Sequence, residues 1–235
     1  MKLDSQNVLP VDAANALLVG RLWQPGVGPT VVVCHHGALY DVTGVAPTTS
    51  QLFEMDALAT TLRKALPGAP KLAELASVLA NCDESTRDPD RPWLLAPCDL
   101  QAIKASGVTF VASMLERVIE EQARGDLTRA QDIRAALTAI IGDNLAQLKP
   151  GSEDAVRVKD ELIKRGAWSQ YLEVGIGPDA EIFTKAPVLS AVGLGADIGI
   201  HPKSVWNNPE PEVVLAVNSR GEVVGAALGN DVNLR

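Results

Sequence analysis

Two glutamates lie on either side of a proline in the segment 204–217, SVWNNPEPEVVLAV. In an extended chain residues two apart point to the same side, so Glu210 and Glu212 face one way while Pro211 faces the other. Proline has a fixed φ and lacks an N–H, which suits a strand entry or an edge strand. Two like charges held this close cost free energy unless one is protonated or a cation binds. The pattern predicts a cation site or, alternatively, two charges on a solvated edge strand.

A third carboxylate, Asp231, belongs to the following predicted strand. The sequence SRGE at 219–222 is typical of a turn, and a two-residue loop there would set Asp231 opposite Glu210 and Gly229 opposite Glu212. A three-residue loop would shift this pairing by one, and a bulge could restore it. Three oxygen ligands without Cys or His favour a hard cation, Mg²⁺ or alternatively Mn²⁺ or Ca²⁺.

The elements around these carboxylates indicate an α+β fold. Helices are expected from the apolar periodicity at 48–66, 71–82 and 127–141, and again after Ser152, where acidic residues suit the first turn. Strands are expected at 16–23, 30–34, 38–40, 171–177, 181–187, 188–200, 212–218 and 222–235.

The polar run 83–92 is the best candidate for a linker. We therefore expect a small β-rich α+β domain over 1–95 and a catalytic domain over 96–235, with a lid-like helical segment at 108–170 and metal-binding strands at 171–235. The segment GNDVNLR ends at Arg235 directly after a strand with no closing helix, so we expect the chain to be truncated at its C-terminus.

Composition limits the partners. The chain has 235 residues, 46% of them hydrophobic, and a net charge of −8, and no run of Lys or Arg exceeds two residues. This excludes an electrostatic footprint for nucleic acid or an anionic membrane and favours a small-molecule partner. Three widely spaced cysteines indicate reduced thiols in a cytoplasmic protein. The N-terminus predicts neither a signal peptide nor a membrane span.

Three segments resemble the fumarylacetoacetate hydrolase family, whose metal site is a Glu-x-Glu pair followed by an Asp. They are GVTFVASMLERVIEE from 107, EIFTKAPVLSAVGLGADIGI from 181 and WNNPEPEVVLAVNSRGEVVGAALGNDVNLR from 206, and the likeness covers roughly 99–235. The interval of 19 residues from Glu212 to Asp231 is shorter than is usual in the family's hydrolases. It resembles the branch of 2-keto-3-deoxy sugar-acid dehydratases.

The resemblance implies a catalytic domain of that family's type, built on a mixed β-sheet, and Mg²⁺-dependent dehydration of a 2-keto-3-deoxy sugar acid. The implied substrate is a pentonate such as 2-keto-3-deoxy-D-xylonate, the product is 2,5-dioxopentanoate, and the role is sugar-acid catabolism, as in xylose degradation. The implied metal ligands are Glu210, Glu212 and Asp231. The full-length form is expected to be a homo-oligomer, as is common in the family.

The resemblance also implies roles outside the metal site. Glu181 matches an acidic active-site position and is the candidate proton-transfer group, and Lys185 falls where the family keeps a lysine near the substrate. Either could instead be a solvated charge on a strand. Ser113 and Glu116 lie in the segment that resembles the family's mobile lid, and we expect them to contact substrate.

The histidines separate dehydration from hydrolysis. Hydrolases of the family activate water with a His–Glu pair on the lid, but residues 99–172 contain no histidine. His35 and His36 lie in a predicted hairpin turn as surface residues, and His201 is expected to be structural. Dehydration is therefore favoured. A C–C hydrolase of a 2,4-diketo acid remains the alternative enzyme, and a metal-binding structural or regulatory fragment the non-enzymatic one.

Overall fold

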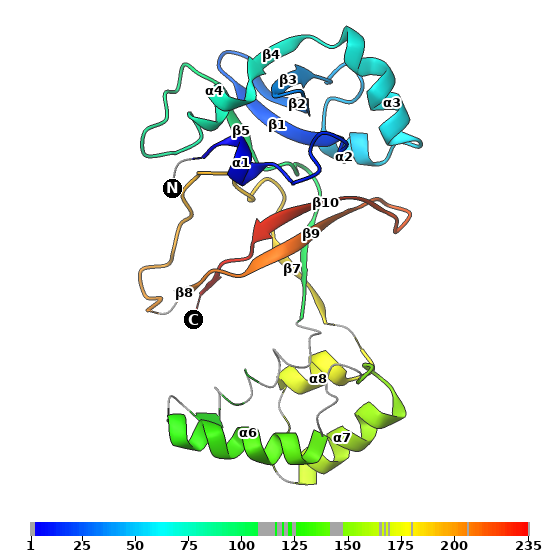
Figure 1. Cartoon of the computed structure of the whole chain (residues 1–235), viewed down its shortest axis with the longest axis vertical. Helices are drawn as coiled ribbons and strands as arrows, with labels where there is room; N and C mark the ends of the chain where they lie inside the picture. Colours follow the sequence, from blue (N-terminus) through cyan, green and yellow to red (C-terminus); the bar gives the residue numbers. More distant parts are fainter. Residues whose placement is uncertain are drawn as a thin grey trace. The chain divides into compact units, whose positions relative to one another are not determined.

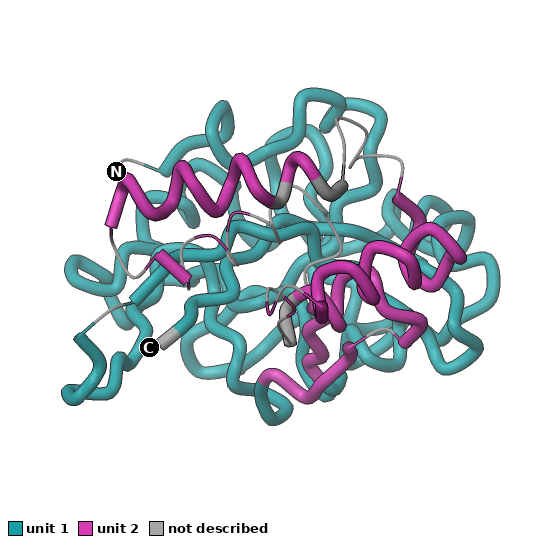
Figure 2. Tube along the Cα trace, turned by 90° about the horizontal axis from the view of Figure 1, so that it is seen from below, with its two compact units in different colours: residues 1–102, 186–235 teal, residues 103–185 magenta. Residues whose placement is uncertain are grey.

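The computed structural model describes residues 3–107, 116, 119, 122–123, 126–141, 148–164, 166, 168, 170–179, 181–205 and 207–234. The chain divides into two compact units, one made of residues 1–102 with 186–235 and the other of residues 103–185 (Figure 2). The fold is α+β, as the sequence predicts. The domain division at residues 95 and 96 stays a prediction.

A five-stranded antiparallel sheet, in the order β4-β3-β2-β1-β5, forms the centre of the first unit (Figure 1). Its strands are β1 (Leu18–Gln24), β2 (Gly28–His35), β3 (Ala38–Asp41), β4 (Lys71–Glu74) and β5 (Trp93–Leu95). The predicted hairpin turn between β2 and β3 is confirmed, with His36 and Gly37 as its two loop residues, both at positive φ. Such a turn matches the twist of the strands it joins.

Both faces of this sheet are buried, because successive side chains on β2 enter different cores. Val32 packs in one core with Leu22, Leu39 and the short helix α4 (Leu75–Leu79). A second core on the other face contains Val31, Val33, Val42, Ala46, Leu52 and Leu62. Leu52 and Leu62 come from α2 (Thr49–Phe53) and α3 (Leu58–Ala65).

Two of the predicted helices differ from the structure. The helix expected over 48–66 is interrupted at Ala57, whose φ is +50°, so it becomes α2 and α3, followed by the 3₁₀ turn η1 (Leu66–Gly68). The helix expected over 71–82 begins instead as β4, because its first residues pair with β3 at the edge of the sheet. Long-range pairing overrides helical propensity here.

The second unit is mainly helical. Its described helices are α6 (Leu127–Ile141), α7 (Glu153–Lys164) and α8 (Gln170–Ile176). The predicted cap of α7 is confirmed, since the Ser152 hydroxyl accepts a hydrogen bond from the N–H of Ala155 at 3.2 Å. The strand expected at 171–177 is wrong. That segment is α8, whose Leu172 and Ile176 lie one turn apart and pack in the same core as Leu162.

Only some of the apolar residues whose periodicity predicts the helix at 127–141 belong to that core. Ala130 and Ile133 pack against it, whereas Leu127 is exposed. The side chains of Leu137, Ile140 and Ile141 lie outside the described residues. Two short strands, β6 (Ile103–Ser106) and β7 (Ile182–Ala186), pair with each other where the chain enters and leaves this unit.

The remaining strands belong to the first unit and form two-stranded pairs. β9 (Pro211–Val217) pairs with β10 (Val223–Asn230), and β8 (Asn207–Asn208) with β11 (Asn233–Leu234), both antiparallel. The mixed sheet expected here is therefore wrong for the described part of the chain, in which every pair of defined register is antiparallel. The family-type arrangement of the catalytic domain stays a prediction.

The strand expected at 188–200 is also wrong. Residues 187–205, all of them described, contain neither helix nor strand. Their backbone makes single hydrogen bonds to the N-terminal part of the unit, such as the N–H of Leu189 to the carbonyl of Asp99 at 3.1 Å and the N–H of Glu84 to the carbonyl of Gly195 at 2.9 Å. Scattered bonds of this kind do not make a ladder.

None of the described helices is long and apolar enough to cross a bilayer.

Candidate metal centre

The β9–β10 hairpin determines where the three predicted carboxylates lie. Gly229 pairs with Glu212, and the N–H of Asp231 donates to the carbonyl of Glu210 at 2.9 Å. This is the pairing that the sequence predicts. It places Glu210, Glu212 and Asp231 on one face of the hairpin, because paired residues and residues two apart point to the same side.

The predicted two-residue loop is wrong. A longer loop followed by a bulge gives the same register. The N–H of Asn218 donates to the carbonyl of Glu222 at 3.0 Å, which leaves Ser219, Arg220 and Gly221 as a three-residue loop with Gly221 at φ +78°. A shift between Val223 and Gly225 then restores the pairing. The alternative of a longer loop with a compensating bulge is thus confirmed, and it puts glycine at the position of positive φ.

The three carboxylates come together at the end of the hairpin. One oxygen from each of Glu210, Glu212 and Asp231 lies within 4.8 Å of the other two. Glu210 and Asp231 are half-buried and Glu212 is exposed. The amide oxygen of Asn230 accepts from the N–H of Glu210 at 2.9 Å, so the backbone that carries the first glutamate is held to the second strand.

This donor set fits a hard divalent cation. All three donors are carboxylate oxygens, which suit Mg²⁺, Mn²⁺ and Ca²⁺. Two oxygens around Ca²⁺ lie up to about 5 Å apart and two around Mg²⁺ up to about 4 Å. A mutual separation within 4.8 Å is therefore compatible with either ion once the side chains rotate toward a shared centre. Cation binding at this cluster stays a prediction, since exposed carboxylates also gather on solvated strands.

Glu181 and Lys185 belong to the other unit, on the β6–β7 strand pair. The carbonyl of Glu181 accepts from the N–H of Gly107 at 3.0 Å, and Lys104 donates to the hydroxyl of Thr184 at 2.6 Å. Glu181 and Lys185 are four residues apart along an extended segment, so both face away from Thr184. Both side chains are exposed, and their roles in catalysis stay predictions.

The two candidate lid residues differ in what the structure describes. Ser113 lies outside the described residues. Glu116 forms a bidentate ion pair with Arg134, with Nε–Oε1 and Nη2–Oε2 separations of 3.1 and 2.5 Å. The hydrogen bond from Arg134 holds the pKa of Glu116 below its ordinary value. Contact of either residue with a substrate stays a prediction.

The surface position predicted for His35 and His36 is confirmed, and the structural role expected for His201 stays a prediction. His35 and His36 are exposed at the β2–β3 turn, with ring centroids 3.9 Å apart. His201 is exposed in the segment before the metal cluster, and its Nδ1 accepts from the N–H of Lys203 at 3.2 Å.

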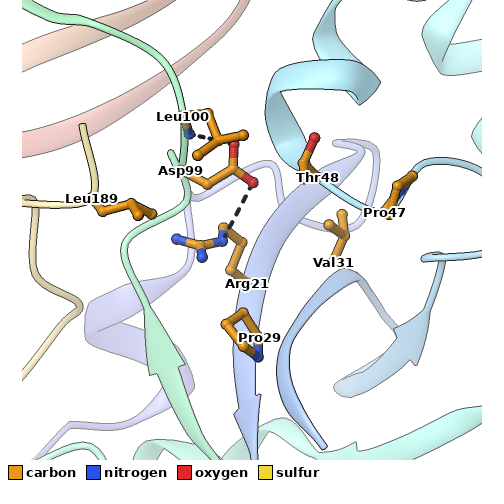
Figure 3. A pocket seen from close by; sticks show the side chains of 8 residues that line it. All are labelled: Arg21, Pro29, Val31, Pro47, Thr48, Asp99, Leu100 and Leu189. Carbon is orange, nitrogen blue, oxygen red and sulfur yellow. Dashed lines mark hydrogen bonds and ion pairs between the residues drawn. The ribbon is translucent and has the colours of Figure 1, made fainter.

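A buried ion pair in the first unit was missed from the sequence. Nε of Arg21 lies 3.7 Å from Oδ2 of Asp99, and both side chains are at least nine-tenths buried. They line a pocket of about 250 Å³ with Thr48, Leu100 and Leu189 among its other walls (Figure 3). The sequence feature that could have indicated this ion pair is an arginine, Arg21, within the apolar run of the first predicted strand.

Asp99 is held by a dense set of donors. Its carboxylate accepts from the N–H groups of Thr49, Ser50 and Leu100 at 2.7, 3.0 and 2.7 Å and from the Ser50 hydroxyl at 2.5 Å. Burial alone raises the pKa of Asp99, but these hydrogen bonds outweigh it, and the pKa lies below its ordinary value. We interpret the pair as a structural link between the sheet, α2 and the segment after β5.

Comparisons with known proteins gave two partial matches. A stretch of 65 residues is 40% identical to the "Probable 2-keto-3-deoxyxylonate dehydratase" of Haloferax volcanii and covers 28% of this chain and 22% of that protein. A stretch of 55 residues is 38% identical to the "2-dehydro-3-deoxy-D-arabinonate dehydratase" of Saccharolobus solfataricus and covers 23% of this chain and 18% of that protein.

The two matches therefore span about a fifth of the length of each relative. No family model matches the chain, and no solved structure gives a significant match. Over about a quarter of its length, this chain is similar to two proteins that are named as dehydratases of 2-keto-3-deoxy pentonates.

Proposed function

We propose that this chain belongs to an Mg²⁺-dependent dehydratase of a 2-keto-3-deoxy sugar acid, of the fumarylacetoacetate hydrolase type. The substrate is a pentonate such as 2-keto-3-deoxy-D-xylonate, and the product is 2,5-dioxopentanoate. The observation that carries the proposal is the cluster of three carboxylates within 4.8 Å of one another. The names of the two partial relatives support the substrate class.

In this proposal Glu210, Glu212 and Asp231 hold the cation. Bound there, Mg²⁺ would polarise the carbonyl of a 2-keto acid and make its C3 protons more acidic. Glu181 is the group that takes a proton from C3 or returns one to the departing C4 hydroxyl. Lys185, on the strand that begins directly after Glu181, is proposed to contact the substrate together with Ser113 and Glu116.

Dehydration fits these residues better than hydrolysis does. Elimination of water from C3 and C4 needs a group that transfers protons but no activated water molecule. Residues 99–172, which include the lid-like segment 108–170, contain no histidine to activate water. The alternative C–C hydrolase would need another base for that step.

The proposal extends to the setting of the protein. Cys34, Cys82 and Cys98 are all free, which fits a reducing compartment such as the cytoplasm. The proposed full-length enzyme is a homo-oligomer that takes part in sugar-acid catabolism.

Metal binding is tested without any substrate. Isothermal titration with Mg²⁺, Mn²⁺ and Ca²⁺ compares the wild type with Glu212→Gln and with Glu222→Gln, a matched control on the same hairpin. We expect Glu212→Gln to abolish measurable binding, because it removes one of three charged ligands, and Glu222→Gln to leave it unchanged. Equal binding by wild type and Glu212→Gln would exclude the cluster as the metal site.

The reaction is tested by incubation with 2-keto-3-deoxyxylonate or with a 2,4-diketo acid, with and without EDTA, followed by mass spectrometry. The proposal expects loss of one water from the first substrate, suppressed by EDTA. Cleavage of the diketo acid alone would favour the hydrolase, and turnover of neither would favour a non-enzymatic role.

Proton transfer by Glu181 has its own test. We expect Glu181→Gln to lower kcat by about 10²- to 10⁴-fold, the usual contribution of a general acid or base, and to leave the Mg²⁺ affinity unchanged. A loss of less than about threefold would remove Glu181 from the mechanism.

A further inference from the structure

Gly107 lies where the chain leaves β6 and meets the start of β7. Its N–H donates to the carbonyl of Glu181 at 3.0 Å, which closes the β6–β7 pair next to that glutamate. Val174 of α8 lies against the same point. Gly107, Val174 and Glu181 all belong to the unit of residues 103–185.

The structure leaves no room for a side chain at this position. A Cβ on residue 107 would lie 2.1 Å from Cγ1 of Val174, 2.9 Å from Oε2 of Glu181 and 3.4 Å from Cβ of Glu181. The first two distances are below any normal carbon contact, so something would have to move. The backbone of Gly107 thus fills the space between the helix and the side chain of Glu181.

The two neighbours would respond differently to an added methyl group. Val174 is β-branched, and its rotamer is restricted on a helix, so relief there means a shift of α8. The carboxylate of Glu181 is the end of a flexible side chain and would swing away at low cost. An added methyl group would therefore move the carboxylate and, independently, loosen the packing of α8.

We propose that Gly107 is a positioning residue, whose missing side chain lets the Glu181 carboxylate fold back against the β6–β7 junction. This inference rests on the proposed function, in which Glu181 transfers a proton. Transfer requires the carboxylate to come within about 2.6 to 3.2 Å of the substrate atom, and a misplacement of about 1 Å can cost about 10²-fold in rate. The absence of a side chain at Gly107 keeps this position open to that carboxylate.

The kinetic test compares Gly107→Ala alone with the double variant Gly107→Ala/Val174→Ala. The second substitution removes the Cγ1 atom that the new methyl group would meet but leaves the contact with Glu181. We expect Gly107→Ala to lower both Tm and kcat, the latter by about 10- to 100-fold, with little change in KM. The double variant should regain Tm and keep the low kcat.

Two controls complete this test. Val174→Ala alone measures the cost of trimming the helix. Gly199→Ala adds a methyl group at a glycine with nothing within 4 Å and should change neither Tm nor kcat. If the double variant regains kcat together with Tm, Gly107 is only a packing residue and the inference is wrong.

A spectroscopic test needs no turnover. In protein with ¹³C-labelled glutamate, the carboxyl resonance of Glu181 is assigned by its loss in Glu181→Gln. It should shift in Gly107→Ala/Val174→Ala relative to Val174→Ala and stay in place in Gly199→Ala. An unshifted resonance would contradict the contact itself.

The two tests distinguish failure of this inference from failure of the proposed function. A wild type that turns over no keto acid contradicts the dehydratase proposal, and with it the catalytic purpose of the contact. A wild type that is active while Gly107→Ala has normal kcat contradicts the positioning role alone.

Discussion

Two strands with similar sequences have opposite environments in this molecule. In β2, TVVVC places Val31, Val32 and Val33 in the interior at 1 to 2% exposure. In β9, EVVLAV leaves its valines and leucine 50 to 67% exposed. The difference comes from what covers them, because helices pack on both faces of the first sheet. In the described part of the chain, β9 forms a two-stranded sheet with β10 and enters none of the buried cores. A β-branched run predicts a strand but not its burial.

The buried cores and the candidate metal site lie in different stretches of the chain. None of the described apolar side chains in 182–233 is buried, yet this stretch carries the three clustered carboxylates of the candidate metal site. The hairpin is attached at its tip, where the N–H and hydroxyl of Ser219 donate to the Glu54 carboxylate at 2.8 and 2.6 Å and Arg220 lies 3.4 Å from Asp56. We therefore expect substitutions in the sheet to affect unfolding and substitutions in the hairpin to affect binding.

Asp99→Ala should show the largest effect on stability. It removes the partner of a buried guanidinium, three hydrogen bonds at the start of α2 and a fourth from the N–H of Leu100. Loss of one partner from a buried pair costs about 3 to 5 kcal/mol. Urea denaturation measures the change. Asp56→Ala, whose carboxylate is almost fully exposed, is the control, and equal effects of the two would contradict a structural role for the Arg21–Asp99 pair.

Leu22→Ala and Leu228→Ala test the comparison with the same chemistry in both regions. Leu22 is fully buried and Leu228 is 87% exposed. The first substitution should lower the free energy of unfolding by about 2 to 5 kcal/mol through loss of burial and the cavity left behind. The second should change it by no more than about 0.5 kcal/mol. A large loss for Leu228→Ala would mean that the hairpin face is covered in solution.

Acid should weaken the sheet region through Asp99. The pKa of Asp99 in the folded state lies below the ordinary value of 3.8. The ionised carboxylate therefore contributes its full stabilisation at pH values above 3.8. This contribution is lost as the pH falls through the folded pKa. Denaturation between pH 5 and pH 2 should show a steeper loss for wild type than for Asp99→Asn. Parallel plots of stability against pH for the two proteins would show that Asp99 has the same pKa in the folded and unfolded states.

The smallest expected change is a gain in thermal stability. With EDTA present, Glu212→Gln removes one of three like charges within 4.8 Å of one another, so Tm should rise, by about 1 to 3 °C. With excess Mg²⁺ the wild type should have the higher Tm of the two proteins, because only the wild type gains stability from the bound ion. Thermal scans of both proteins in the two buffers make the measurement. A wild type that does not respond to Mg²⁺ would contradict the metal site.

Local rules were sufficient for much of the candidate site. The alternation of an extended strand put Glu210 and Glu212 on one side, and the hairpin brought Asp231 to them even though its loop is one residue longer than predicted. The Ser152 cap and the exposed histidines of the β2–β3 turn were likewise predictable from neighbouring residues. Each of these features depends on residues close in sequence, or on a single turn that joins them.

Tertiary structure decided the rest. Residues 170–176 contain strand-forming residues but fold as a helix, because Leu172 and Ile176 find a shared core with Leu162. The first residues of the helix expected at 71–82 became an edge strand by pairing with β3. Arg21 and Asp99 are 78 positions apart, and no spacing rule joins them. Which carboxylates share a face follows from strand alternation, a property of the local backbone that the residue spacing already shows. Partners distant in the chain determined which apolar runs are buried and which charges are paired, since burial and ion pairing depend on what the folded chain brings alongside.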